Sequence, residues 1–345
     1  MSVSCGPAEQ LSAGAKVQRA FDKLGQQKSL SADISLDANA DEIYAALKDT
    51  EDFERRDADL LEGLKLTSAS AFDKPLKDVK SGDENGSGAF KLAKNNGKAL
   101  LEVRCIGKKY YVRGDLKAFS ELPSSKDRDD RAGIDELMRK ADELPSSMGA
   151  VKNAVKGEWV VLDADAFKEL AEKRGKSKNG ARGEEEQLDP KSRQQIFDAV
   201  RKALGDNAEF KAAGKKGGAD HVKVTVPAKK VAADLAKALE PLRKKLGKDG
   251  KPSGPDGAPK KDVTVDVAIK NGMISALTLD LSQLDEKVKG KLPLVIGLHG
   301  GAGGVMAPSG AQELKPQDLV AAMMRLAMDR MGERGAPNGA DGLRI

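Results

Sequence analysis

Apolar and polar residues alternate strictly in many short stretches of the chain, as in Leu30, Ala32, Ile34 and Leu36. A period of two indicates a β-strand with one buried face. This pattern predicts eleven strands, at 29–37, 63–71, 88–94, 99–106, 109–115, 158–163, 208–213, 221–226, 263–269, 274–281 and 292–298. Tight turns such as Asn271-Gly272 join several of them, so we expect antiparallel neighbours.

Apolar residues at helical spacing predict helices between these strands. The expected helices run from Ala15 to Gly25, over 41–48, 134–148, 190–204 and 229–246, and after Lys315, where the helix is rich in methionine. We expect those methionines to cap the core rather than to form a promiscuous contact surface. The stretches 174–186 and 247–261 carry no apolar period and are interpreted as loops. Strands and helices do not alternate as βαβ units, so the predicted class is α+β: one large antiparallel sheet of about eleven strands with helices on one face.

Composition narrows the possible functions. Hydrophobic residues make up 39% of the chain and aromatic residues 3%, with a single tryptophan, so the core must be aliphatic and deformable. The net charge of +5 is spread along the chain, which does not favour specific nucleic-acid binding. No apolar run approaches the roughly 18 residues that a membrane-spanning helix needs.

The two cysteines differ in their surroundings. Cys5 lies in Ser-Val-Ser-Cys-Gly and is followed by small and polar residues, which resembles the mature start of a bacterial lipoprotein whose thiol carries a diacylglycerol. No basic or apolar leader precedes it, so this interpretation expects a leader that has been removed. The alternative is an ordinary unpaired cysteine, and spacing alone does not separate the two. Cys105 shares the strand phase of Leu101 and Val103 and is expected in the core.

Several local pieces, read in order, resemble one family. They are Cys5-Gly6, the first helix running into 31–36, the strand pair 101–104 and 109–113, the segment 158–162, the hairpin at Asn271-Gly272, and 307–311 near the end. Together they resemble the bacterial lipoproteins of the LolA, LolB and LprG type, especially the actinobacterial LppX, LprA, LprF and LprG branch. The resemblance covers about residues 15–314.

This resemblance implies a sheet curved as a half-barrel around helices, an apolar cavity that holds acyl chains, and a membrane anchor on the outer face of the cell membrane. The chain is accordingly expected to divide into a flexible tether over 1–14, one domain over 15–314, and a Met-rich helix and tail over 315–345. The expected ligand is a lipid or another amphiphile, with no cofactor and no catalysis, and the partner transporter is not identified. Alternation suggests the wall residues Leu101, Val103, Val224, Val265, Val267, Leu277 and Leu279, each of which could equally be plain core.

Two other functions remain open. The chain could be an exported interaction module without a ligand cavity. It could also be an esterase, because 294–304 resembles the His-Gly-Gly strand exit of α/β-hydrolases. That fold needs a Gly-x-Ser-x-Gly elbow and a later histidine. Here only Ser309 in Pro-Ser-Gly follows, so a glycine-rich strand exit is the preferred interpretation. Of the two histidines, His221 has the opposite phase to Val222 and is expected in solvent, and no metal-ligand spacing includes His221 or His299.

Overall fold

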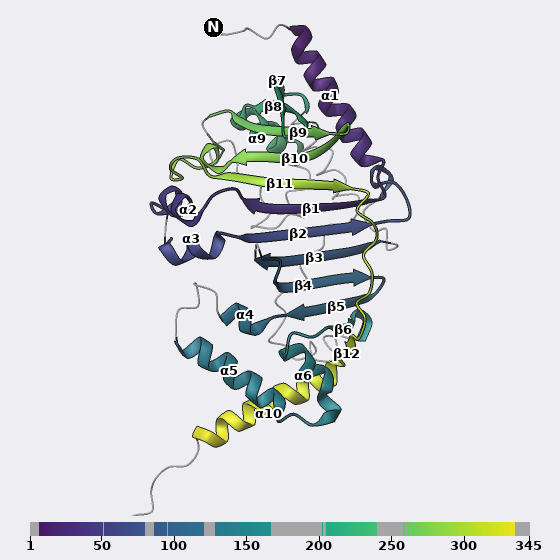
Figure 1. The fold of residues 1–345 in the computed structure, drawn as a ribbon, viewed down its shortest axis with the longest axis vertical. Helices are drawn as coiled ribbons and strands as arrows, with labels where there is room; N and C mark the ends of the chain where they lie inside the picture. Colours follow the sequence, from purple (N-terminus) through teal and green to yellow (C-terminus); the bar gives the residue numbers. More distant parts are fainter. Residues whose placement is uncertain are drawn as a thin grey trace, which may run out of the picture. The chain divides into compact units, whose positions relative to one another are not determined.

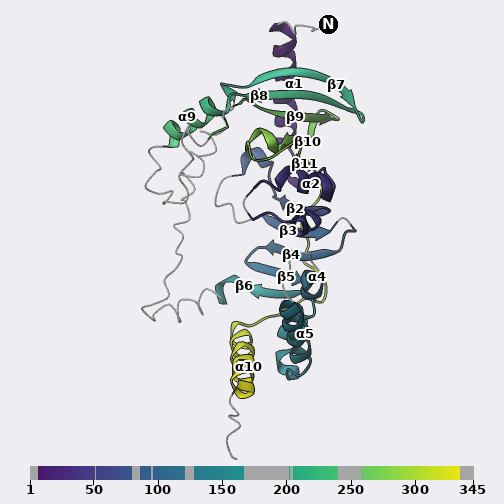
Figure 2. The same ribbon diagram turned by 90° about the vertical axis from the view of Figure 1, so that its left-hand side faces the viewer.

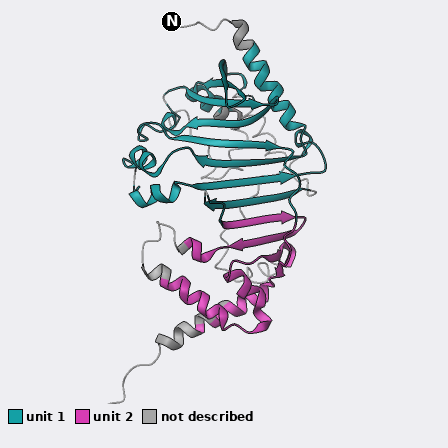
Figure 3. Ribbon diagram, in the orientation of Figure 1, with its two compact units in different colours: residues 1–99, 179–306 teal, residues 100–178, 307–345 magenta. Residues whose placement is uncertain are grey.

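The computed structural model describes residues 7–50, 52–79, 86–94, 96–120, 128–166, 202, 205–239, 258–259 and 261–334. The class is α+β, as predicted, with an open sheet of twelve strands that is antiparallel except for one short parallel pair. The chain divides into two compact units, formed by residues 1–99 with 179–306 and by residues 100–178 with 307–345 (Figures 1 and 3).

The first unit contains eight strands in the order β3-β2-β1-β11-β10-β9-β8-β7. Their bounds are β1 (Ser29–Leu36), β2 (Leu64–Ala71), β3 (Ser87–Lys94), β7 (Glu209–Lys216), β8 (Ala219–Val226), β9 (Val263–Lys270), β10 (Met273–Asp280) and β11 (Pro293–Gly300). Every neighbouring pair is antiparallel. The first and the last strands of the chain's alternating pattern, β1 and β11, thus lie side by side at the centre of this unit (Figure 1).

Helix α1 (Pro7–Gly25) lies against β7, β9 and β10. Its small residues allow a close approach: Ala13 and Ala20 are buried with Val267 and Ile269 of β9 in one core cluster. A Cβ added at Gly14 would lie 3.1 Å from the Phe210 ring, so a larger residue there would require the ring to shift by a few tenths of an ångström. The helix begins eight residues before the predicted Ala15, so residues 7–14 are helical rather than a flexible tether.

The described residues of this unit form three further helices, α2 (Ala40–Leu47), α3 (Arg55–Leu61) and α9 (Ala228–Leu239), with short 3-10 turns η1 (Leu76–Asp78) and η5 (Leu281–Gln283). Asn39 and Glu42 form a capping box that starts α2. Ile43, fully buried, packs with Ala58 and Leu292 in a second core cluster. The predicted helix at 190–204, the loop at 174–186, and nearly all of the loop at 247–261 lie outside the described residues.

The second unit contains β4 (Ala99–Ile106), β5 (Lys109–Gly114), β6 (Val160–Asp163) and β12 (Gln312–Glu313), in the order β4-β5-β6-β12. Its helices are α4 (Leu116–Ser120), α5 (Arg128–Asp142), α6 (Gly149–Val155) and α10 (Pro316–Arg334), with the 3-10 turn η2 (Ser146–Met148). Val160 of β6, Val151 of α6 and Ala322 of α10 share a core cluster. Within the predicted helix 134–148, α5 ends at Asp142 and the 3-10 turn η2 follows Pro145, and α6 begins only at Gly149.

Helix α10 corrects one expectation. Among the α10 residues whose burial is described, Pro316 and Ala322 are buried, whereas Met324 and Met328 are 60% and 68% exposed. The methionines at these two positions therefore do not cap the core, because the helix turns its small residue inward.

The Asn271-Gly272 turn confirms the strongest hairpin signal. Both residues have positive φ, 54° and 72°, as a type I′ turn requires, and Lys23 Nζ donates to the Asn271 carbonyl at 2.7 Å. We predict that Gly272→Ala lowers the free energy of unfolding by about 1 kcal/mol, the cost of a left-handed alanine. Gly304→Ala is the control, because Gly304 lacks a positive φ and an added Cβ there meets nothing within 4 Å. Urea unfolding of the two variants tests this, and equal midpoints would contradict it.

Candidate functional site

A row of aliphatic side chains crosses the first unit on one face of the sheet. The strand registers pair these residues directly opposite one another, from β3 to β8: Leu92, Leu66, Ile34, Ile296, Leu277, Val267 and Val222. Directly opposite residues point to the same side of a sheet. We call these seven residues the aliphatic row.

Burial divides the aliphatic row into two parts. Under α1, Val222 and Val267 are buried, 2% and 4% exposed. Farther along the row, Ile296, Ile34, Leu66 and Leu92 are only half-buried, and they belong to none of the three buried core clusters. The described part of the chain therefore leaves an apolar stretch of sheet that α1 does not seal.

Five of the seven predicted wall residues lie on this same face. Val267 and Leu277 are in the aliphatic row, and Val224, Val265 and Leu279 form the adjacent row, in register across β8, β9 and β10. The structure thus brings these five together on one surface. Whether they line a ligand cavity stays a prediction.

The other two predicted wall residues, Leu101 and Val103, are in β4 of the second unit. Both are half-buried, and Val103 lies opposite Val112 of β5. Cys105, on the same side of β4, is also half-buried rather than enclosed in the core as expected, and its Sγ lies 3.7 Å from the Gly107 carbonyl oxygen. Cys105 is less buried than expected because it lies near the end of β4, beside the Gly107 turn, where the edge of the sheet is open to solvent.

The opposite face of the first unit is polar at its centre. Asp33 accepts a hydrogen bond from Thr67 Oγ1 at 2.7 Å and pairs with Lys65 Nζ at 2.9 Å. His299 Nε2 lies 3.3 Å from the Asp33 carboxylate. Partial burial alone would raise the Asp33 pKa, but Thr67, Lys65 and His299 outweigh it and hold the pKa below its ordinary value. The side chain of His299 is 58% exposed, and among the described residues its ring contacts the Asp33 carboxylate and not Ser309.

His221 corrects another expectation. It has the opposite phase to Val222, as predicted, but its side chain is only 19% exposed. Its Nδ1 lies 3.0 and 3.1 Å from the two Asp266 oxygens on the neighbouring strand. The cross-strand carboxylate and the bulge in β7 therefore shelter a ring that strand phase alone places in water.

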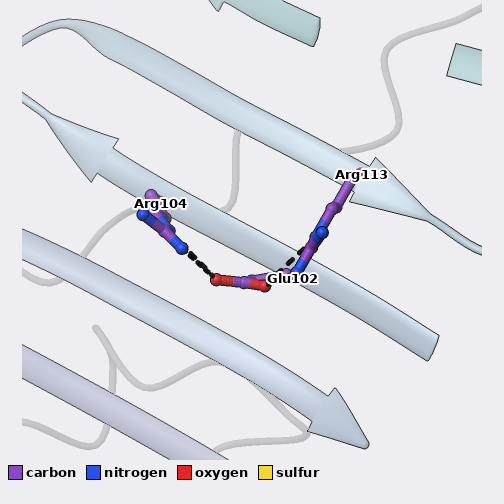
Figure 4. A network of polar contacts seen from close by, with 3 residues as sticks. All are labelled: Glu102, Arg104 and Arg113. Atoms are coloured by element: carbon purple, nitrogen blue, oxygen red, sulfur yellow. Dashed lines mark hydrogen bonds and ion pairs between the residues drawn. The ribbon is translucent and has the colours of Figure 1, made fainter. Parts of the chain in front are cut away.

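A polar cluster in the second unit was not predicted. Glu102, 6% exposed, accepts two hydrogen bonds from Arg104 on one carboxylate oxygen, at 2.7 and 3.0 Å. Arg113 donates two to the other oxygen, at 2.7 and 3.2 Å (Figure 4). Both guanidinium groups also lie over the Trp159 ring, 4.9 and 4.8 Å from its centre. We call these four residues the Glu102 cluster.

The electrostatics of the Glu102 cluster are those of a tightly held anion. Burial alone would raise the pKa of the Glu102 carboxyl, but the hydrogen bonds and charges of Arg104 and Arg113 lower it below its ordinary value. The carboxylate is satisfied on both oxygens, so the cluster fixes β4 against β5 and does not offer an acid or a base for catalysis.

Two of the hollows among the described residues are open depressions with both polar and apolar lining. One of about 380 Å³ lies between α1 and the β7–β8 hairpin and is lined by Ser12, Ala13, Lys16, Asp220 and His221 among others. Another, of about 290 Å³, lies beside η5 and includes Lys261, Glu286 and Lys289. Neither contains a predicted wall residue, so the predicted lipid cavity is not among these hollows.

Cys5, the predicted anchor, lies outside the described residues. Among the described helices, none is long and apolar enough to cross a bilayer. Within the described ranges, no group of three or more histidine, cysteine, aspartate or glutamate side chains is placed to hold a metal ion.

Comparisons with known proteins find five chains of solved structures, including two from mycobacteria. No family model matches the chain, and no curated protein matches it. The lipoprotein LppX of Mycobacterium tuberculosis is 11% identical, with 86% of this chain and 99% of that chain covered and a TM-score of 0.32. LprF from Mycobacterium bovis is 15% identical, with 87% and 98% covered and a TM-score of 0.33.

Both proteins belong to the group that the sequence resembles. Likeness at these identities and TM-scores carries no argument about ligand or mechanism, so those must come from this chain's own residues. The chain is similar to the mycobacterial lipoproteins LppX and LprF.

Proposed function

We propose that this protein is a non-catalytic lipoprotein, anchored through Cys5 to the outer face of the cell membrane, that holds a lipid or another hydrophobic ligand against the aliphatic row. The supporting observation is the half-buried stretch Ile296, Ile34, Leu66 and Leu92, which continues the buried part of the row beyond α1.

The dimensions of this stretch suit one acyl chain. Neighbouring strands lie about 4.8 Å apart, so four strands span about 14 Å. One leaflet of a bilayer has a hydrocarbon thickness of about 15 Å. Each methylene removed from water contributes about 0.8 kcal/mol, so a chain laid along this stretch gains substantial binding energy without any catalytic group.

Native mass spectrometry after gentle purification tests ligand binding. We expect a fraction of the protein to carry additional mass of the size of a lipid, which organic extraction removes. The extracted protein should then bind a fluorescent fatty acid. Repeated recovery of the bare chain, together with no binding of the fatty-acid probe, would overturn the proposal.

Anchoring has its own prediction. When the protein is made from its own gene in cells fed an alkyne analogue of palmitate, we expect the label to be incorporated and to disappear in Cys5→Ser. Cys105→Ser is the matched control, because Cys105 is the other cysteine and lies within β4. Label that persists in Cys5→Ser, or that disappears in Cys105→Ser instead, would contradict the anchor.

The alternative is an envelope interaction module without a ligand. The observation that favours it is the exposure of Met324 and Met328 on α10, together with Met306 at 76%. Exposed methionines suit an adaptable protein contact. The two functions are separated by the mass measurement, because a module without a ligand is recovered bare.

A further inference from the structure

The β7–β8 hairpin carries a concentration of exposed positive charge. Lys211, Lys215 and Lys216 are on β7 and Lys223 is on β8, and all four are exposed. We call them the hairpin lysines. Within the described part of the chain, Lys211, Lys216 and Lys223 take part in no ion pair, and they share the face of the hairpin away from α1. Lys215 is on the other face, opposite Asp220, whose carboxylate already pairs with Lys16 of α1 at 2.6 Å.

The arrangement of these lysines is unfavourable for the isolated protein. Lys211 lies directly opposite Lys223, and like charges in that position destabilise a strand pair. Lys223 faces Asp266 on its other side, but the Asp266 carboxylate is held by His221. A hollow of about 370 Å³ is lined by Lys211, Lys216, Lys223, His221 and Asp266, among others. Lysines on an edge strand such as β7 commonly prevent pairing with another sheet. That explanation does not cover Lys223, because β8 lies inside the sheet between β9 and β7.

Helix α1 places this charge close to the N-terminus. Its N-terminal half lies over the hairpin, where Gly14 meets Phe210 and Lys16 pairs with Asp220. Its C-terminal end lies at β10, where Lys23 donates to Asn271. The chain therefore enters the unit at the β7 edge (Figures 1 and 2).

The distance from Cys5 to the hairpin is short. The helical residues from Pro7 to Ser12 rise about 8 Å, and two further residues reach at most about 7 Å. A lipid anchor at Cys5 would therefore hold the hairpin within about 15 Å of the bilayer. The potential of an anionic bilayer falls off over about 10 Å, so the hairpin lysines enter that field when the two residues before Pro7 are less than fully extended.

We propose that the hairpin lysines form a docking surface for the anionic phospholipid headgroups of the membrane. This inference rests on the proposed anchor at Cys5. The anchor holds the protein at the membrane, and the hairpin sets its orientation, with the β7 edge against the headgroups. An acyl anchor combined with a basic patch is a recognised route to stable membrane attachment.

Vesicle co-sedimentation of the unacylated Cys5→Ser chain tests this surface without the anchor. The vesicles contain phosphatidylcholine alone or with about one-third phosphatidylglycerol. We expect binding only to the anionic vesicles, and weaker binding in more salt. Each lysine near such a surface contributes about fivefold in partitioning, so the quadruple variant K211Q/K215Q/K216Q/K223Q should bind at least tenfold more weakly.

The matched control is K77Q/K109Q/K287Q/K291Q, which removes the same charge from exposed lysines elsewhere. It should bind within about twofold of the parent. A quadruple Lys→Arg variant of the hairpin should retain binding, which separates charge from folding. Equal losses in both Gln variants, or binding that does not depend on anionic lipid, would overturn the docking surface.

Native mass spectrometry of the same variants separates this proposal from the proposed function. We expect the hairpin variant to keep its lipid ligand while it loses vesicle binding. If no form of the protein carries a lipid ligand, the parent included, that result contradicts the proposed lipid carrier. It leaves the docking surface unaffected.

Discussion

Replacing Glu102 by alanine should lower the free energy of unfolding by about 2–3 kcal/mol. The substitution removes four charge-assisted hydrogen bonds and leaves Arg104 and Arg113 as like charges beside one another. Breaking a fully buried ion pair costs about 3–5 kcal/mol, and the two arginines here are 27% and 38% exposed, which lowers the expected cost. Guanidinium chloride unfolding followed by Trp159 fluorescence measures it, because Trp159 is the single tryptophan and lies against both arginines.

Glu136→Ala is the control in the same unit. Glu136 also accepts two hydrogen bonds from an arginine, Arg139, at 2.6 and 3.0 Å, but on the exposed surface of α5. Water replaces an exposed partner, so the unfolding midpoint should hardly change. If Glu102→Ala and Glu136→Ala both unfold at the same denaturant concentration as the parent, the ion pairs of the buried Glu102 do not stabilise the fold, and the prediction is wrong.

The contribution of Glu102 depends on pH in a defined direction. Its pKa is lower in the folded protein than in the unfolded chain, so its stabilisation is complete above the unfolded pKa of about 4.3. It is lost as the pH falls through the lowered folded pKa. We therefore expect the stability difference between the parent and Glu102→Gln to be constant from pH 7 to about 5 and to shrink below that. If the stability difference between the parent and Glu102→Gln instead grew as the pH fell, folding would raise the Glu102 pKa and not lower it.

The Glu102 cluster also shows which contacts can be predicted from the sequence and which cannot. The two-residue turn Gly107-Lys108 pairs Ile106 with Lys109, and counting back along both strands places Glu102 opposite Arg113. This salt bridge could therefore have been predicted from the turn and the strand alternation. Trp159 could not, because the β5–β6 pair is separated by α4, α5 and α6, and no local signal sets its register.

The same limit applies to the aliphatic row. The Asn271-Gly272 turn sets the β9–β10 register only as far as Ile274, because a bulge after Ile274 shifts the pairing by one residue and brings Leu277 opposite Val267. The β1–β11 pair joins Ile34 to Ile296, and no turn relates segments so distant in sequence. Of the aliphatic row, Val267 and Leu277 were predicted as wall candidates, and the half-buried Ile296, Ile34, Leu66 and Leu92 were missed. Strand β12 was missed because two residues, Gln312 and Glu313, are too short to show a period.

The second large effect is expected at Ile296, at the centre of the aliphatic row. Ile296→Gln should lower the affinity for a fluorescent fatty acid by about 10- to 100-fold, because it removes an apolar contact of about 1.5–3 kcal/mol and places an amide against hydrocarbon. Val295→Gln is the matched control, since Val295 is the adjacent half-buried β-branched residue and points to the opposite face, between Ser35 and Thr278. Thermal unfolding of the extracted proteins separates folding from binding. If both variants bind the probe as the parent does, with folding intact, the ligand does not lie on the aliphatic row. If only Val295→Gln loses binding, it lies on the polar face instead.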